Sequence, residues 1–301
     1  MLGTDTLRKI QQYGVFGSTE ILLSRIRRKT GFDEWRCRNA PRYAGPTDDE
    51  LLEIERALGN VGVLVHDYSP PLEKFCEFRK AGYFPEHYHG GPRSGVWDEK
   101  LLEHWIAADR LDLFKYDESD IYVDVAACGS PWAKALRERL RIQAYAIDLD
   151  INPEFSGLDF YREENATQTR FADSSVRGMS LQCAFEMFLE SDDLDFISEI
   201  SRILKPGGKA IILPLYMHTH YCAYSTPDYF GKGFSHPDAT EYVRMDTSGV
   251  RSSRKYDSET LKERVLDPIT SLGLSYRLMA LRNKLEFGNE IYCHFILEIN
   301  K

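Results

Sequence analysis

The segment Val123-Asp-Val-Ala-Ala-Cys-Gly-Ser-Pro-Trp132 decides the fold class of this chain of 301 residues. Residues 121–126 form an apolar run typical of a buried β-strand, and the run leads into a turn of small residues. Pro131 suits the first position of a helix, which the apolar spacing predicts over residues 132–140. Because the turn lacks the GxGxxG pattern that seats a dinucleotide pyrophosphate, we expect a ligand without phosphates.

The same alternation of strand and helix signals continues to residue 299. The segments that have strand character are 144–149, 179–183, 209–215, 275–281 and 290–299, and those with helical character are 194–204 and 257–272. The last two strand segments follow one another and are expected to pair antiparallel. This order predicts an α/β fold with a doubly wound, mostly parallel sheet, which binds ligands at the carboxyl ends of its strands.

The first 115 residues have a mixed pattern. We expect a short helix near residues 22–26, a helix that opens at the capping box Thr47-Asp-Asp-Glu50, a strand at 61–65 and a helix at 98–111. The polar stretch at 115–120 separates this region from the rest. We therefore predict a mostly helical extension at 1–115, acting as a substrate cap or a dimerisation element, and one domain at 116–301 with an aromatic-rich insertion at 216–256.

Composition limits the classes of function. The chain has 47 acidic residues against 38 Lys and Arg, a net charge of −9, so it lacks the basic surface of a nucleic-acid binder or of a protein held at an anionic membrane. It contains no apolar run near the roughly 20 residues of a membrane helix. The six cysteines form no CxxC pairs, which favours reduced thiols in a cytoplasmic protein.

Three further motifs stand at positions where such a sheet binds its ligand. Asp148 ends the strand after the Asp124 strand, where a carboxylate can accept both hydrogen bonds of a ribose diol or can simply cap a turn. The stretch at 165–176, which begins Asn165-Ala-Thr-Gln-Thr-Arg-Phe-Ala-Asp173, lies before the strand segment at 179–183. The stretch Arg202-Ile-Leu-Lys-Pro-Gly-Gly208 ends a helix before another strand.

Together these motifs resemble the class I S-adenosylmethionine-dependent methyltransferases, in the broad group called methyltransferase type 11. The resemblance covers about residues 115–215, and the stretch ending at Gly208 is its most specific part. It implies a Rossmann-like sheet of seven strands and S-adenosylmethionine as the cofactor. The chain departs from the family pattern at Ala126, Ala127 and Pro131, which replace glycines, and at Asn165, which replaces an acid.

The resemblance also implies which residues bind the cofactor. They are Asp124, Ala126, Ala127 and Gly129 for the methionine part, Asp148 for the ribose hydroxyls, Ala166 and Thr167 for the adenine, and Cys183 for the sulfonium end. Methyl transfer is mainly a matter of positioning, but a hydroxyl acceptor needs a base.

His218 and His220 are the candidates for that base. They are two residues apart in an extended segment after a strand, so both side chains can reach one point. A histidine pair of this kind can act as a general base, can ligate a divalent metal together with a carboxylate, or can simply be solvated. We assign the base role and no metal, and we add Glu186 as a residue that orients the substrate or caps a helix.

The predicted function is transfer of a methyl group to a small-molecule acceptor, with the hydroxyl of a sugar or natural product preferred. No Asn/Asp-Pro-Pro-Tyr motif of amino-directed nucleic-acid methyltransferases occurs. Two alternatives remain: a regulatory module with a degenerate cofactor site, suggested by the lost glycines, and a nicotinamide-dependent oxidoreductase, which the missing GxGxxG disfavours.

Overall fold

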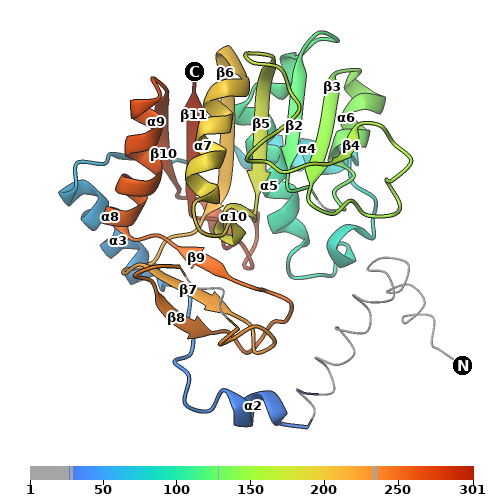
Figure 1. Ribbon diagram of the computed structural model, residues 1–301. Helices are drawn as coiled ribbons and strands as arrows, with labels where there is room; N and C mark the ends of the chain where they lie inside the picture. The colour runs from blue at the N-terminus through green and yellow to red at the C-terminus, as the bar shows by residue number, and fades with distance from the viewer. Residues whose placement is uncertain (1–26, 28–29, 128, 233–235) are drawn as a thin grey trace, which may run out of the picture.

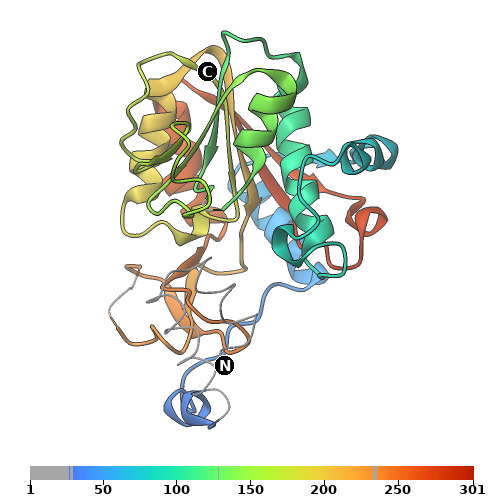
Figure 2. The ribbon, with the colours of Figure 1, turned by 90° about the vertical axis from the view of Figure 1, so that its right-hand side faces the viewer.

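The computed structural model describes residue 27 and residues 30–127, 129–232 and 236–301 (Figure 1). The short helix expected near residues 22–26 lies outside these ranges. The described chain forms a large sheet with helices on both faces, and a small second sheet lies beyond one end of its strands (Figures 1 and 2). Among the described helices, none is long and apolar enough to cross a bilayer.

The large sheet has eight strands. In spatial order they are β1 (Val65–Tyr68), β10 (Ser275–Leu281), β11 (Phe295–Asn300), β6 (Leu204–Leu215), β5 (Val176–Gln182), β2 (Ile121–Val125), β3 (Gln143–Asp148) and β4 (Tyr161–Glu163). Strand β11 is antiparallel to both of its neighbours, and the other pairings are parallel. The predicted doubly wound sheet with an antiparallel pair is therefore confirmed.

The strand count differs from the predicted seven because β1 of the N-terminal region joins the edge of the sheet beside β10. The sequence placed a strand slightly earlier, at residues 61–65, and it did not indicate the three-residue strand β4. A strand that short has too few residues to show an alternating pattern.

The helices predicted from residue 47 and at 98–111, 132–140, 194–204 and 257–272 form close to the expected residues, whereas those at 32–36, 72–81 and 284–287 were not predicted. Their bounds are α2 (Phe32–Arg36), α3 (Asp48–Asn60), α4 (Leu72–Ala81), α5 (Trp97–Arg110), α6 (Trp132–Leu140), α7 (Asp192–Ile203), α8 (Ser258–Leu261), α9 (Asp267–Ser271) and α10 (Lys284–Phe287), with short turns η1 (Tyr88–Gly90), η2 (Leu113–Lys115) and η3 (Phe185–Met187). The π-helical turn η4 (Lys262–Leu266) joins α8 to α9, so one continuous helix covers the predicted range. The capping box is present: Glu50 N donates to Thr47 Oγ1 at 3.3 Å, and Thr47 N donates to Glu50 Oε2 at 2.7 Å.

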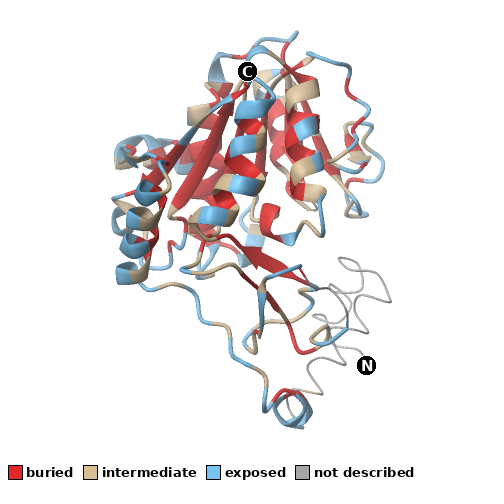
Figure 3. Ribbon diagram, turned by 60° about the vertical axis from the view of Figure 1, so that its left-hand side comes forward, coloured by how far each residue is buried: buried red, intermediate tan, exposed pale blue. Residues whose placement is uncertain are grey.

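Two apolar cores flank the large sheet because its strands point alternate side chains to opposite faces. Val123 and Val125 of β2 enter the core covered by α3, α7, α8 and α9. Tyr122 of the same strand enters the other core, covered by α4, α5 and α6. Figure 3 shows the buried strands between helices whose outward faces are exposed. Helices α3 and α5 of the N-terminal region therefore help to bury the main sheet.

The predicted insertion at 216–256 contains a sheet of its own, which we call the cap sheet. It consists of β7 (Cys222–Ser225), β8 (Thr240–Val243) and β9 (Ser253–Lys255), in the order β8-β7-β9. The N-terminal region meets it where Tyr43 N donates to Val243 O at 3.0 Å. In Figure 1 the cap sheet lies below the carboxyl ends of the parallel strands, which is the ligand side of this fold.

Candidate active site

Neighbouring parallel strands bring the predicted cofactor residues to one edge of the sheet. Asp124 is the last residue but one of β2, Asp148 ends β3, and Cys183 directly follows β5. Strand β2 pairs with both β3 and β5, with Asp124 opposite Ala146 on one side and Ser180 on the other. The carboxyl ends of these strands therefore lie side by side.

Asp124 is a buried carboxylate. The residue is 1% exposed, and no described residue donates a well-formed hydrogen bond to either carboxylate oxygen. Burial raises the pKa of Asp124 to about 7, and the negative charge of Asp148 acts in the same direction. The nearby Ser130 side chain acts to lower the pKa of Asp124. Leaving such a group unsatisfied is costly, so the site fits a ligand that brings a cation or hydrogen-bond donors.

The turn after β2 is built from small residues for a local reason. Ala126 has φ of 54°, a left-handed conformation that is uncommon for residues other than glycine. Ala127 N donates to Ile147 O at 3.1 Å, which ties the turn to β3. At Gly129 a Cβ atom would lie 3.0 Å from Asn152 Nδ2, so a larger residue there would displace the Asn152 side chain of the loop after β3.

Asp148 caps a turn, which is one of the two roles that the sequence left open. Its Oδ1 accepts a hydrogen bond from Asp150 N at 3.3 Å, so the side chain caps the turn after β3. The residue is also half-buried at the edge where β2 and β3 end. The position is therefore compatible with hydroxyl binding without being dedicated to it.

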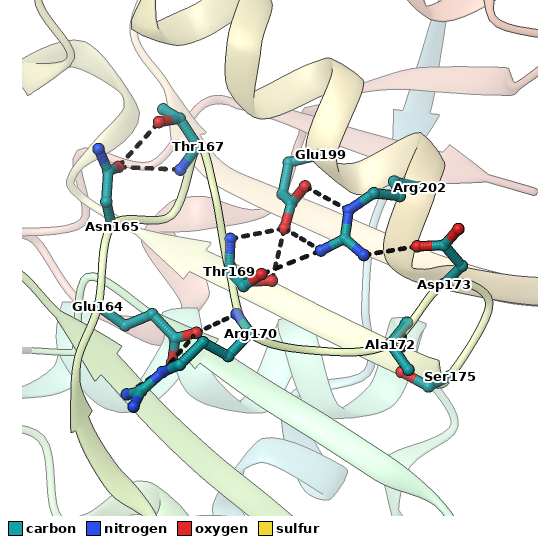
Figure 4. A network of polar contacts seen from close by, with 10 residues as sticks. All are labelled: Glu164, Asn165, Thr167, Thr169, Arg170, Ala172, Asp173, Ser175, Glu199 and Arg202. Carbon is teal, nitrogen blue, oxygen red and sulfur yellow. Dashed lines mark hydrogen bonds and ion pairs between the residues drawn. The ribbon is translucent and has the colours of Figure 1, made fainter.

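The loop that follows β4 contains Ala166 and Thr167. Asn165 Oδ1 accepts hydrogen bonds from Thr167 N at 2.9 Å and from Thr167 Oγ1 at 3.0 Å (Figure 4). An aspartate would accept the same two hydrogen bonds, so the turn is retained with asparagine at the position where the family has an acid. Thr167 also lines a groove of about 380 Å³ between the loop and α7.

Helix α7 anchors this loop through two of its side chains. Glu199 Oε1 accepts hydrogen bonds from Thr169 N at 2.7 Å and from Thr169 Oγ1 at 2.5 Å. Arg202 donates to Glu199 at 2.7 and 2.8 Å, to Asp173 at 2.6 Å and to Thr169 O at 3.1 Å (Figure 4). Arg202, which begins the most specific family motif, therefore fixes the position of the predicted adenine loop.

Cys183 lies in a dense polar cluster. Its Sγ is 2.8 Å from Lys100 Nζ, 3.1 Å from Glu103 Oε1, 3.4 Å from Tyr216 Oη and 3.5 Å from Tyr292 Oη. Lys100 and the fully buried Glu103, both from α5, form an ion pair of 3.0 Å. Cys183 also has φ of 49°, and backbone conformations of this kind concentrate at functional sites.

Two further buried groups complete this Cys183 cluster. Glu186 Oε2 is buried and has no hydrogen-bond partner among the described residues, and burial raises the pKa of Glu186. Lys255 of β9 donates to Ser253 Oγ at 2.9 Å, and its Nζ lies 3.9 Å from the centroid of the Tyr216 ring. Burial lowers the pKa of Lys255 to about 8, against the opposing effect of Glu186.

The sequence did not reveal Lys100, Glu103 or Lys255. The segment that contains Lys100 was predicted only as a helix, and Lys255 lay in a predicted loop. The sequence signal for Lys100 and Glu103 is their place in an apolar helix. Such a signal does not identify Cys183, about 80 residues away, as their partner.

The predicted base candidates lie in the cap, between β6 and β7. The rings of His218 and His220 are 4.5 Å apart, centroid to centroid. His218 Nε2 is 3.3 Å from Ala44 O, and His220 Nε2 is 2.9 Å from Tyr242 Oη. Burial lowers the pKa of His218, with the neighbouring His220 acting in the same direction. In the described part of the chain, neither ring bonds to Cys183 or Glu186.

Comparison with known proteins gives a family match. Residues 123–212 match the family model described as a methyltransferase domain, which spans β2 to β6. No curated protein matches the chain.

Solved structures with similar folds have low identity to this chain. The geranyl diphosphate C-methyltransferase of Streptomyces coelicolor A3(2), in complex with Mg²⁺, geranyl diphosphate and S-adenosyl-L-homocysteine, has 14% identity and a TM-score of 0.40, over 86% of this chain and 99% of that one. A methyltransferase of Haloferax volcanii in complex with its methyltransferase activator has 18% identity and a TM-score of 0.38, over 68% and 92% of the two chains. Similarity at this level says nothing about the acceptor.

Proposed function

From the match of residues 123–212 to the methyltransferase-domain model, we propose that the chain is a class I S-adenosylmethionine-dependent methyltransferase and that it methylates a hydroxyl of a small molecule, a sugar or another natural product. The observation that carries the cofactor assignment is the buried carboxylate of Asp124 at the carboxyl end of β2, to which no described residue donates a well-formed hydrogen bond. Burial of a carboxylate costs free energy, and a cation that binds beside it offsets this cost.

The residues at this edge fit S-adenosylmethionine. The cofactor supplies a methyl group bonded to a positively charged sulfur, together with an ammonium group and a ribose diol. We assign the ammonium to Asp124 and the diol to Asp148. We assign the adenine to the loop of Ala166 and Thr167, which α7 holds in position, and the sulfonium end to Cys183. Binding and orientation are then the main contributions of the chain to catalysis.

The Cys183 cluster supports a polar acceptor. Glu186 has a buried oxygen without a partner, which can accept a hydrogen bond from a hydroxyl. Lys255 and Tyr216 lie beside it and present a donor and an aromatic face. Aromatic rings of the cap, among them Tyr43 and Tyr224 with centroids 4.4 Å apart, suit the apolar face of a sugar or a flat ring. We propose that the cap sheet and the N-terminal region cover this acceptor.

His218 or His220 is our proposal for the base. The lowered pKa of His218 keeps its imidazole neutral near pH 7, which is the state that can accept a proton. Tyr43 contacts the His218 ring at 6.1 Å and the Tyr224 ring at 4.4 Å between centroids, and Lys255 Nζ lies 5.2 Å from the Tyr224 ring centroid. We propose that the acceptor lies along these rings.

Calorimetry with S-adenosylhomocysteine tests the cofactor assignment. We expect micromolar binding that weakens at least tenfold, about 1.4 kcal/mol, in Asp148→Ala. Asp150→Ala is the matched control, because Asp150 is an exposed carboxylate on the same turn. Absence of binding to the wild-type protein would contradict the proposal. Binding without methyl transfer to any of a panel of hydroxyl acceptors would favour the regulatory module.

Single substitutions of the histidines test the base. In metal-free protein, His218→Ala or His220→Ala is expected to lower kcat by about 10²–10⁴ on an acceptor that the wild-type enzyme methylates. Affinity for S-adenosylhomocysteine is expected to stay unchanged. Glu241→Gln is the control for local disturbance, because Glu241 is an exposed residue of β8 in the same cap sheet. If both variants keep the wild-type rate and pH profile, the base lies elsewhere.

A further inference from the structure

The segment His218-Thr-His220-Tyr-Cys222 gathers three metal-binding side chains. The chain bends at Thr219 and His220, between β6 and β7, and β7 begins at Cys222. One ring nitrogen of each histidine and the Sγ of Cys222 all lie within 4.8 Å of one another. The cap sheet therefore holds Cys222, and the two histidines lie in the connection that leads into it.

We propose that His218, His220 and Cys222 bind a transition-metal ion of borderline softness, with Zn²⁺ as the reference ion. Two imidazoles and one thiolate match the ligand preference of this ion, whereas Mg²⁺ and Ca²⁺ prefer oxygen ligands. Metal–nitrogen and metal–sulfur bonds of about 2.0 and 2.3 Å place ligand atoms about 3.5 Å apart. Side-chain rotations that move the ligand atoms by about 1 Å therefore bring them to the distances of metal coordination.

Hydrogen bonds to the rings support this arrangement. A backbone carbonyl only accepts, so the contact of 3.3 Å between His218 Nε2 and Ala44 O places the proton on Nε2 and the lone pair on Nδ1. His220 Nε2 is oriented by Tyr242 Oη at 2.9 Å. Orientation of a ligating imidazole through its second nitrogen is usual at metal sites.

Both Nδ1 atoms contact the hydroxyl of Thr219. Its Oγ1 lies 3.2 Å from His218 Nδ1 and 3.3 Å from His220 Nδ1. Thr219 N also donates to His218 Nδ1 at 2.9 Å, and a bound metal ion would replace these contacts. The nearby cation Lys255 is directed over the ring of Tyr216, 3.9 Å from its centroid. Asp257, whose Oδ2 accepts from Tyr221 N at 3.2 Å, adds negative charge beside the segment.

A metal ion held by these three ligands can also bind the acceptor. Three protein ligands leave one coordination position open, as in catalytic zinc sites. An acceptor hydroxyl in that position loses its proton more easily, and this consequence rests on the proposed function. Binding of the metal ion does not depend on that function. A metal ion occupies the nitrogens that a base would use, so the two roles of the histidine pair are alternatives.

Titration of the full-length protein with the metal alone tests the site. After removal of metals with a chelator, we expect one Zn²⁺ per chain with a Kd below about 1 µM by calorimetry. Co²⁺ is expected to produce ligand-field absorption together with a thiolate charge-transfer band. Cys222→Ser is expected to abolish the charge-transfer band and weaken Zn²⁺ binding by at least about 100-fold. His220→Gln is expected to weaken binding similarly.

Cys76→Ser is the control, because Cys76 is a free cysteine of α4 outside the site. It is expected to keep wild-type binding, and far-UV circular dichroism of every variant shows whether the fold is intact. Absence of stoichiometric binding, or equal binding by wild type and Cys222→Ser, overturns the proposal. Binding of S-adenosylhomocysteine is measured on the same samples, so a failure of the cofactor assignment is seen separately from a failure of the metal site.

Discussion

At the scale of single residues, Asp124 links stability to function. Its carboxylate is buried, and burial raises the pKa of Asp124 to about 7. In the unfolded chain an aspartate titrates near pH 3.9. The folded protein therefore binds this proton more tightly than the unfolded chain does. The stabilisation is complete at low pH and is lost as pH rises toward and through about 7.

This sign gives a testable pH dependence. Between pH 5 and pH 8, we expect the cofactor-free protein to lose about 2–3 kcal/mol of stability through Asp124. Asp124→Asn, which cannot ionise, is expected to lack this loss. Urea unfolding of both proteins at the two pH values measures the difference. Equal changes in wild type and variant would show that Asp124 ionises freely, whereas Asp150→Asn is expected to behave like wild type.

Single residues also explain departures from the family pattern. Gly178 stands where the family often has aspartate, and Tyr116 Oη occupies the place that a side chain would need. Asn165 replaces an acid and forms the turn with Thr167. These substitutions are adjustments to local packing, and they leave the edge formed by β2 and β3 intact.

At the scale of elements, the attachment of the loop after β4 to α7 depends on Arg202. Arg202→Met removes its bonds to Thr169, Asp173 and Glu199 and leaves Glu199, 6% exposed, without its cation. We expect a loss of about 1–3 kcal/mol in the free energy of unfolding and weaker binding of S-adenosylhomocysteine through the displaced adenine loop. Urea unfolding and calorimetry measure the two effects.

Lys134→Met is the control for this experiment, because Lys134 is exposed on α6. Arg202→Lys retains the charge but not the forked geometry, so an intermediate loss is expected. If Arg202→Met keeps both stability and affinity, the network does not position the loop.

Elements with strong periodicity were predictable, and short ones were not. Helix α5 and strand β2 were expected at nearly their observed bounds because their apolar residues recur at helical or strand spacing. The cap sheet was expected only as an aromatic-rich connection. Its strands have three or four residues each, and they are fixed by pairing with one another.

At the scale of the whole molecule, the N-terminal region is tied to the last strands. Besides the pairing of β1 with β10, Glu55 of α3 accepts hydrogen bonds from Arg282 at 2.6 and 2.7 Å and contacts His294 at 3.0 Å. The same region reaches the cap sheet through Arg42, whose backbone forms an isolated β-bridge with Val243. Residues before the methyltransferase domain thus bring the cap and the main sheet together around the ligand edge.

The sequence by itself determined the α/β class, the placement of Asp124 and Asp148 at strand ends, and the capping of α3. These follow from periodicity and from contacts between residues close in the chain. Tertiary structure alone decided which groups surround Cys183, because Lys100, Tyr216 and Tyr292 come from segments far apart in sequence. It likewise decided that β1 joins the sheet. Contacts of this kind arise when elements pack, and no local pattern encodes them.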